Sequence, residues 1–375
     1  MFYRNARIFC ADHQFRLGAF QVVNGRFGAV LPEEVPADAV DLCGATVIPG
    51  LIDIHTHGCC GADFSDGDYE GLLSMAKYYA RAGVTSFCPA SMTLPYEDLE
   101  KAFGCAQRLA SQAPEGCAVL RGIQMEGPYF SHARRGAQNP EHLKAPDLDG
   151  FSRLQAGCGG LVRIVGIAPE LPGAMEFIKN ASQLCAVAVA HTDCDYDQAS
   201  DAFDAGATVL THLFNAMPGL HHRYPGPIAA AAERETVRAE LICDGQHVHP
   251  AMVRLAFSLF GQRVILISDS GRCCGMPEGS RFILGGQEAT LSGGIARLND
   301  GTIACSAANL FSCMVNAIAF GVKEELAVAA ATYNPACAIG AEGVVGSIEP
   351  GKRADFLVCS KDYSRKTVFL AGKAL

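Results

Sequence analysis

The sequence has no run of about eighteen apolar residues, the length that a membrane-spanning helix needs. Its first residues, MFYRNARIFCADHQ, contain no apolar stretch of the kind that a secretory signal peptide requires. Positive charge is also scarce, because 30 Lys and Arg residues stand against 39 Asp and Glu residues and the net charge is −9. We therefore expect neither a membrane nor a nucleic-acid partner, although a local basic pocket for a small anion is compatible with this balance.

A disulfide scaffold is not expected either. The seventeen cysteines fall mostly in apolar stretches, and their number is odd. We therefore expect a cytoplasmic protein whose thiols stay reduced and pack as small core residues. The adjacent pairs Cys59-Cys60 and Cys273-Cys274 lack the spacing of a structural zinc site. The alternative is that one of these thiols is a nucleophile or a metal ligand, but no His–Cys pairing is apparent.

Short apolar runs alternate with longer amphipathic segments through the middle of the chain. Eight runs are apolar on both faces, as the strands of a parallel sheet are, and eight such units predict a closed (β/α)8 TIM-like barrel. An open doubly wound sheet is the alternative, but no GxGxxG motif follows the first run. The predicted strands are Val47–Asp53, Val84–Ala90, Leu120–Glu126, Val162–Ala168, Ala186–His191, Thr208–His212, Ala239–Asp244 and Val264–Asp269.

The two ends of the chain differ from its middle, because they contain short β-like pieces separated by turns. We expect residues 1–48 and 344–375 to form a small β-sandwich domain beside a barrel of residues 49–343. Within the barrel, residues 281–301 are rich in glycine and in β-forming residues. This composition predicts a β-hairpin insertion before the last helices.

The predicted strands stay apolar until their carboxyl ends, where acidic and imidazole side chains appear. In a (β/α)8 barrel these ends converge on one mouth, where active sites lie. His55 and His57 are separated by one residue, so both rings point to the same side of an extended strand. Four imidazoles and two carboxylates suit Zn²⁺, Fe²⁺ or a similar divalent ion, whereas the alternative is a set of hydrogen-bonded polar residues that closes the mouth. The candidate ligands and acid are His55, His57, Glu126, His191, His212 and Asp269.

Longer motifs surround these candidates. The chain contains PGLIDIHTHG from Pro49, EGPY from Glu126, GAQNP from Gly136, THLFNAM from Thr211 and DGQHV from Asp244. With these motifs the sequence resembles the N-acetylglucosamine-6-phosphate deacetylases of the metal-dependent amidohydrolase superfamily over nearly its whole length. The tail motif at 346–355 is common across that superfamily, whereas THLFNAM with a following Arg-x-Pro-Gly is more specific.

The resemblance implies roles for the polar residues at the strand ends. Glu126, His191 and His212 match the ligands of one metal, and Asp269 matches the catalytic acid and base. His55 and His57 match the pair that holds a second metal in some members, so one or two ions are expected, with Glu126 as a bridge. Zinc is expected first, with iron, manganese, cobalt or nickel as alternatives. No lysine occupies a matching strand end, which favours a glutamate bridge over a carbamylated lysine.

The resemblance also implies a site for an amino-sugar phosphate. Arg223 and His247 match residues that bind the phosphate, and these groups can reach the site from a partner subunit, so we expect a homodimer. Gln138 stands where some members have a histidine that polarises the acetyl carbonyl. Gln138 can donate a neutral N–H but supplies no charge, and a second metal could compensate. The remaining matches to substrate-binding positions are Asn215 and the backbone of Ala216 and Met217.

The function expected from these matches is hydrolysis of N-acetylglucosamine 6-phosphate to glucosamine 6-phosphate and acetate. The same reaction on the galactosamine epimer is the nearest alternative, since inversion at C4 need not change the motifs. Another amidohydrolase, such as a dihydroorotase or a dipeptidase-like enzyme, is disfavoured by the absence of a bridging lysine and by the Arg223 segment. A sugar-phosphate sensor without turnover is disfavoured because Asp269 is intact.

Overall fold

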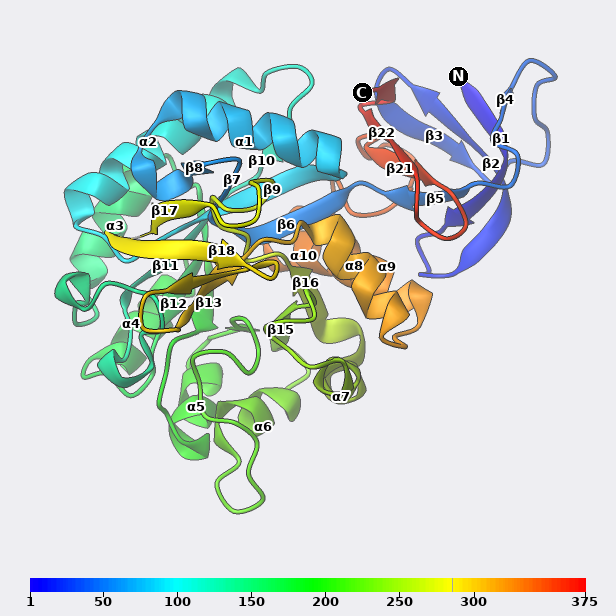
Figure 1. The fold of residues 1–375 in the computed structure, drawn as a ribbon. Helices are drawn as coiled ribbons and strands as arrows, with labels where there is room; N and C mark the ends of the chain where they lie inside the picture. The colour runs from blue at the N-terminus through cyan, green and yellow to red at the C-terminus, as the bar shows by residue number, and fades with distance from the viewer. Residues whose placement is uncertain (285) are drawn as a thin grey trace.

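Eight parallel strands surrounded by helices form the larger part of the molecule (Figure 1), and the computed structural model describes residues 1–284 and 286–375. Each barrel strand pairs with the next one along the chain. The ring closes where the backbone N–H of Asp269 donates to the carbonyl of His55, at 3.0 Å. The predicted (β/α)8 barrel is thus confirmed. Its strands are β6 (Leu51–Thr56), β9 (Val84–Ser91), β11 (Ile123–Tyr129), β12 (Val162–Ile167), β13 (Ala186–Val189), β14 (Val209–Leu210), β15 (Arg238–Ile242) and β16 (Val264–Ile267).

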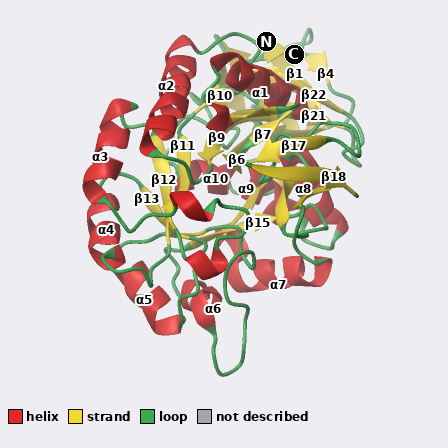
Figure 2. Cartoon of the chain, turned by 60° about the vertical axis from the view of Figure 1, so that its left-hand side comes forward, coloured by secondary structure: helices red, strands yellow, loops and turns green. Residues whose placement is uncertain are grey.

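Apart from the last one, whose Ala336 belongs to the apolar cluster of the barrel lumen, the helices pack on the outside of the barrel (Figure 2), against strands that are buried on both faces. Inside the barrel a separate apolar cluster fills the lumen with branched side chains such as Ile164, Ile242 and Ile265, so the barrel is a packed core and not a pore. Within the described ranges, no helix combines the length and the apolarity needed to cross a bilayer. The helices are α1 (Tyr69–Ala82), α2 (Tyr96–Gln112), α3 (Leu148–Gly157), α4 (Ala174–Ala181), α5 (Tyr196–Asp204), α6 (Gly226–Ala232), α7 (Pro250–Phe260), α8 (Leu310–Ala319), α9 (Glu324–Ala331) and α10 (Tyr333–Ala338).

Strands from the two ends of the chain form a separate β domain (Figure 1). They make one sheet in the order β23-β22-β21-β5-β1-β2-β3, with β4 beside β1. The sheet covers an aromatic cluster that includes Tyr3, Phe20, Phe27 and Phe356. Its strands are β1 (Phe2–Phe9), β2 (Phe15–Val23), β3 (Arg26–Val30), β4 (Val40–Asp41), β5 (Thr46–Pro49), β21 (Phe356–Cys359), β22 (Lys366–Leu370) and β23 (Lys373–Ala374).

The predicted first barrel strand, Val47–Asp53, is in fact two strands that meet at Gly50. The part before Gly50 belongs to the terminal sheet, and the part after it enters the barrel. The backbone passes so close to Thr85 at this point that a Cβ on Gly50 would lie 2.1 Å from the threonine Oγ1. Only glycine fits there, and its N–H donates to the carbonyl of Asp355 at 2.8 Å, which joins the two domains.

The segment for which a hairpin is predicted forms a larger unit. It is a four-stranded antiparallel sheet of β17 (Arg281–Leu284), β18 (Gln287–Ser292), β19 (Ile295–Leu298) and β20 (Ile303–Ser306). This inserted sheet lies at the barrel mouth, because the N–H of Ser306 donates to the carbonyl of Asp269 at 3.0 Å. Gln287 also donates from Nε2 to the carbonyl of Ala137, at 2.8 Å. The inserted sheet therefore supports both sides of the mouth.

Candidate metal centre

One carboxylate lies between the four predicted histidines at the carboxyl ends of the barrel strands. Glu126 Oε1 lies 3.2 Å from Nε2 of both His191 and His212, and 3.3 Å from Nε2 of His55. Its other oxygen, Oε2, lies 3.2 Å from Nε2 of His57. Two groups of ligand atoms result, each with all atoms within 4.8 Å of one another, and Glu126 belongs to both. This arrangement fits two adjacent cations that share a carboxylate.

Asp269 lies beside these groups without belonging to either of them. Its Oδ1 lies 3.3 Å from Nε2 of His57 and 3.8 Å from Nε2 of His55. Neither group of candidate ligands includes Asp269, which follows β16, whereas Glu126 lies on β11. The carboxylate is therefore available to handle protons next to a metal.

Each of the four histidine rings has its Nε2 toward Glu126 and its Nδ1 within hydrogen-bond distance of an oxygen atom. A ring whose Nδ1 donates to an oxygen carries its lone pair on Nε2, the nitrogen that can bind a metal. His55 Nδ1 lies 3.0 Å from Oε2 of Glu240. The other rings pair at Nδ1 with backbone carbonyl oxygens: His57 with Ala90 at 3.1 Å, His191 with Arg134 at 3.0 Å and His212 with Asn215 at 3.2 Å. All four Nε2 atoms are thereby oriented as ligands.

The backbone turns sharply at three of the site residues. His191, His212 and Asp269 have positive φ angles of 44°, 27° and 47°. Each residue comes two positions after the last residue of its strand, β13, β14 or β16. A non-glycine residue in this region costs about 1–3 kcal/mol and persists where the surroundings hold it. The turns direct these side chains across the mouth and not along their strands.

The electrostatics of the cluster favour a cation. Burial alone would raise the pKa values of Glu126 and Asp269, but the neighbouring histidines hold both below their usual range. Burial alone would lower the pKa of His57, but hydrogen bonds to the two carboxylates raise it to about 10. His55 Nε2 is buried and has no hydrogen-bond partner among the described residues. The buried acids thus attract positive charge, and a divalent metal among the Nε2 atoms would supply it.

A cavity of about 270 Å³ opens above the cluster. Of the residues predicted to bind substrate, Gln138, Asn215, Ala216 and His247 line it. Gln138 Nε2 donates to Glu126 Oε2 at 2.8 Å, and its Oε1 accepts from the N–H of Thr93 at 2.7 Å, which fixes the orientation of the amide. The site therefore combines candidate metal ligands with a small polar pocket.

Two predicted substrate residues do not reach this cavity within one chain. Met217 is outside the cavity wall and its side chain is buried in the apolar core, so only its backbone, the part that the resemblance matches, remains for a substrate contact. Arg223 lies on the exposed loop that extends away from the barrel before α6 (Figure 2). Its Nη1 lies 2.7 Å from Nε2 of the neighbouring His222. In the described part of the chain the cavity wall contains no thiol, which gives the cysteine alternative no support.

Two residues behind His55 were not predicted from the sequence. Glu240, in the middle of β15, is fully buried and accepts from His55 Nδ1. Gln124, with its amide oxygen toward the ring, also accepts from this nitrogen at 2.7 Å and donates to Glu240 at 3.2 Å. A charged residue within a strand that is otherwise apolar was the available signal, because a buried carboxylate needs a partner.

We expect Glu240→Ala to weaken one metal position selectively. Without its carboxylate, the His55 ring keeps only Gln124 as an acceptor at Nδ1 and loses the charged one, and such losses typically reduce metal affinity about 10–100-fold. Titration with a competing chelator should show one weakened ion and one unchanged ion per chain. Glu240→Gln, which keeps an acceptor oxygen, should have the smaller effect. Equal weakening of both ions would contradict a role specific to His55.

The fold and the site define a class: a (β/α)8 barrel with a His/Glu centre for a divalent metal at the carboxyl ends of its strands. The comparison with known families agrees, since the model of the Amidohydrolase family matches residues 46–375. The chain belongs to this family, which confirms the superfamily expected from the sequence motifs.

Individual relatives within the family are deacetylases of phosphorylated amino sugars. The chain is 33% identical to N-acetylgalactosamine-6-phosphate deacetylase from Escherichia coli O157:H7, over 96% of this chain and 94% of the relative. It is 36% identical to N-acetylglucosamine-6-phosphate deacetylase from Bacillus subtilis (strain 168), over 88% and 83%. A point mutant of N-acetyl-D-glucosamine-6-phosphate deacetylase from Mycobacterium smegmatis, solved in complex with N-acetyl-D-glucosamine-6-phosphate, superposes with a TM-score of 0.93 at 33% identity and covers 100% of this chain and 98% of that one.

Proposed function

We propose that this chain hydrolyses the acetamide of N-acetylglucosamine 6-phosphate to acetate and glucosamine 6-phosphate. The observation that carries the proposal is the pair of ligand groups sharing Glu126, with Asp269 Oδ1 3.3 Å from His57. A relative at 36% identity and a solved structure at a TM-score of 0.93 are named as deacetylases of this substrate, which supports the same assignment.

The donor set suits a borderline divalent ion. Imidazole nitrogens and a carboxylate oxygen are typical zinc ligands, and iron, manganese, cobalt and nickel accept the same donors. Glu126, His191 and His212 would hold one ion, and His55 and His57 with Glu126 would hold the second. A divalent ion lowers the pKa of water toward 7 and polarises a carbonyl, which are the two activations that amide hydrolysis needs.

Asp269 would carry the proton in this reaction. The attacking water adds its oxygen to the acetyl carbon, and Asp269 Oδ1 accepts the proton that the water releases. The C–N bond breaks when the same proton passes from Asp269 to the departing nitrogen, which gives acetic acid and the amine. The acid then ionises to acetate, and the amine takes up that proton to become an ammonium group. The cavity places Gln138 and His247 on the walls around this path.

His247 and Arg223 would bind the phosphate from two chains. His247 lines the cavity, and its Nδ1 lies 2.6 Å from Oδ2 of Asp244, which fixes the ring. Arg223 lies on an exposed loop away from the cavity of its own chain. We propose a homodimer in which this loop brings Arg223 to the partner's cavity, where its planar guanidinium suits phosphate oxygens.

We extend the proposal to a cytoplasmic location. All seventeen cysteines are free thiols, which is the state that a reducing compartment maintains. The acidic balance of the sequence argues against a nucleic-acid partner.

A substrate panel tests the function and the phosphate site together. Acetate release should occur with the two phosphorylated N-acetylhexosamines, fall strongly without the phosphate, be absent with a cyclic amide, and stop when a chelator removes the metal. Arg223→Ala should raise KM for the phosphorylated substrate about 10-fold or more, because a charge-assisted contact is lost, and leave the unphosphorylated sugar unaffected.

The matched control for Arg223→Ala is Arg153→Ala. Arg153 is an exposed arginine on α3, and its substitution should leave every KM unchanged. No preference for the phosphate would exclude the role of Arg223. Turnover with full activity in the chelator would overturn the function itself. Mixing Arg223→Ala with Asp269→Asn chains tests the dimer, since mixed dimers should regain one intact site.

The galactosamine epimer is the second candidate, favoured by the 33% identity to the Escherichia coli O157:H7 relative across 96% of this chain. The two sugars differ only at C4, and this inversion need not change the motifs that supply the proposed metal and phosphate ligands. The ratio of kcat/KM for the two substrates in the same panel decides between them.

A further inference from the structure

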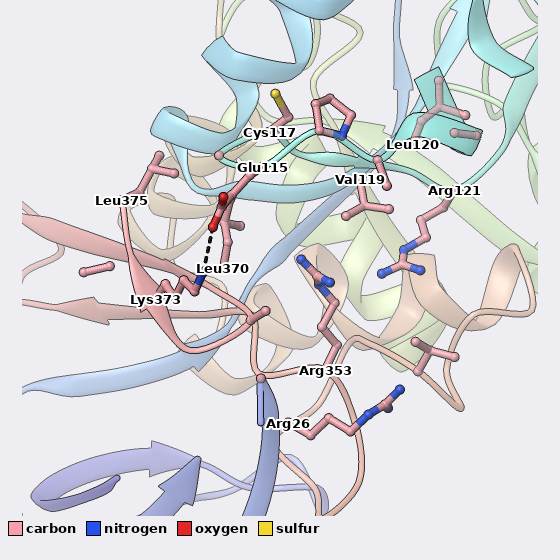
Figure 3. A pocket seen from close by; sticks show the side chains of 18 of the residues that line it. Arg26, Glu115, Cys117, Val119, Leu120, Arg121, Arg353, Leu370, Lys373 and Leu375 are labelled. Carbon is pink, nitrogen blue, oxygen red and sulfur yellow. Dashed lines mark hydrogen bonds and ion pairs between the residues drawn. The ribbon is translucent and has the colours of Figure 1, made fainter. Parts of the chain in front are cut away.

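A second and larger cavity, of about 750 Å³, lies at the other end of the barrel (Figure 3). Its walls come from the loop after α2, from β10 (Val119–Leu120) and from the terminal β domain. Arg121 lines it just before β11, whereas Glu126 stands further along that strand toward the mouth. The two cavities are therefore separated by the packed lumen of the barrel.

Three arginines line this second cavity: Arg26, Arg121 and Arg353. Figure 3 shows the guanidinium groups of Arg121 and Arg353 pointing toward one another across the space. Arg121 is held from behind, where its Nε donates to Ser86 Oγ at 3.2 Å, and Arg353 is held by Asp355, 2.9 Å from its Nε. Among the described residues neither guanidinium uses its Nη atoms in a hydrogen bond, so two forks remain available.

The positive charge of this cavity is only partly compensated. Asp355 pairs with Arg353, and Glu115 pairs with Lys373 at 2.7 Å in the same wall, but no carboxylate of the described residues lies within ion-pair distance of Arg121. Burial lowers the pKa of Arg121, and the nearby charge of Arg353 lowers it further, against the opposing effect of Asp355. Like charges held together at half-buried positions, as Arg121 and Arg353 are, repel one another unless an anion joins them. Such a concentration of guanidinium groups stands out in a chain of net charge −9.

We propose that this cavity binds a phosphorylated small molecule of nucleotide size, with its phosphates between Arg121 and Arg353. A guanidinium group can donate two parallel hydrogen bonds to two oxygens of one phosphate. Val119, Val344 and Leu370 add an apolar wall against which a flat ring can pack. The volume favours a ligand larger than a sugar phosphate, since the cavity at the metal centre is about 270 Å³ and this one about 750 Å³.

Calorimetric titration of the intact, metal-loaded protein tests this site, with ADP, inorganic pyrophosphate and glucosamine 6-phosphate as probes and excess Mg²⁺ present. We expect ADP to bind once per chain, and more tightly than pyrophosphate. Arg121→Gln and Arg353→Gln should each raise the Kd for ADP about tenfold or more, as expected for the loss of a charge-assisted pair. Arg153→Gln, on the exposed face of α3, is the matched control and should leave the Kd unchanged.

Three results would overturn the proposal. They are the absence of ADP binding, an unchanged Kd in both arginine variants, and pyrophosphate binding as tight as that of ADP, which would remove the ring from the ligand. Arg353→Gln leaves buried Asp355 without its partner and could unfold the β domain. Arg121→Lys is the second variant, because it keeps the charge but loses the fork, and its Kd should rise while its thermal unfolding stays that of the parent. Acetate release without ADP is measured in parallel, so this test and that of the proposed function fail separately.

Discussion

Asp269→Asn should lose nearly all turnover and keep its metal. An amide cannot accept the proton that the attacking water releases, and losing a general acid or base costs about 10²–10⁴-fold in rate. The fold should persist, because Asn has the shape of Asp and tolerates the positive φ of 47° at this position. Neither group of candidate ligands includes Asp269, so metal analysis of the purified variant should match the parent while kcat falls.

The control for this change is Asp300→Asn. Asp300 caps an exposed turn of the inserted sheet, where its Oδ1 accepts from the N–H of Thr302 at 2.9 Å, close to the same cavity. The same chemical change there should leave kcat intact. Parental activity in Asp269→Asn would remove this residue from catalysis, and loss of metal in that variant would show that the carboxylate acts as a ligand.

The barrel and the cluster at its mouth could be predicted because both follow from local patterns. Apolar runs ending in acidic or imidazole residues mark strands whose carboxyl ends meet. Glu126, His191 and His212 come from different strands, and the fold brings their ligand atoms within 4.8 Å of one another. The small β domain was predictable in the same way, since both ends of the chain contain β-like pieces separated by turns.

The remaining features depend on contacts between distant segments. The break at Gly50 arises from its close approach to Thr85, which no pattern around residue 50 reveals. Glu240 supports His55 from a strand far along the chain, so its role appears only after the barrel closes. The family motif predicts which residue type stands at position 223, but it does not predict the conformation of the loop that carries Arg223. Sequence patterns thus predict elements better than the contacts between them.

Glu126→Gln should remove both metal ions, whereas His55→Ala should remove one. Glu126 is the only residue common to the two ligand groups found among the described residues, and its two oxygens face different histidines. A neutral amide neither supplies the charge nor offers two equivalent oxygens, so both positions lose a ligand. Elemental analysis per chain should give two ions for the parent, one for His55→Ala and close to none for Glu126→Gln.

The catalytic rate of His55→Ala tests whether the second ion compensates for the neutral side chain of Gln138. Gln138 can donate a neutral N–H but supplies no positive charge, and in the structure its Nε2 is directed at Glu126 Oε2, 2.8 Å away. We expect the second ion to provide the polarisation that a neutral amide cannot, so a one-ion variant should be much slower than the parent. Gln138→Ala serves as the control, because it should keep both ions. One ion per chain with an unchanged rate in His55→Ala would mean that the His55–His57 position does not contribute to the reaction.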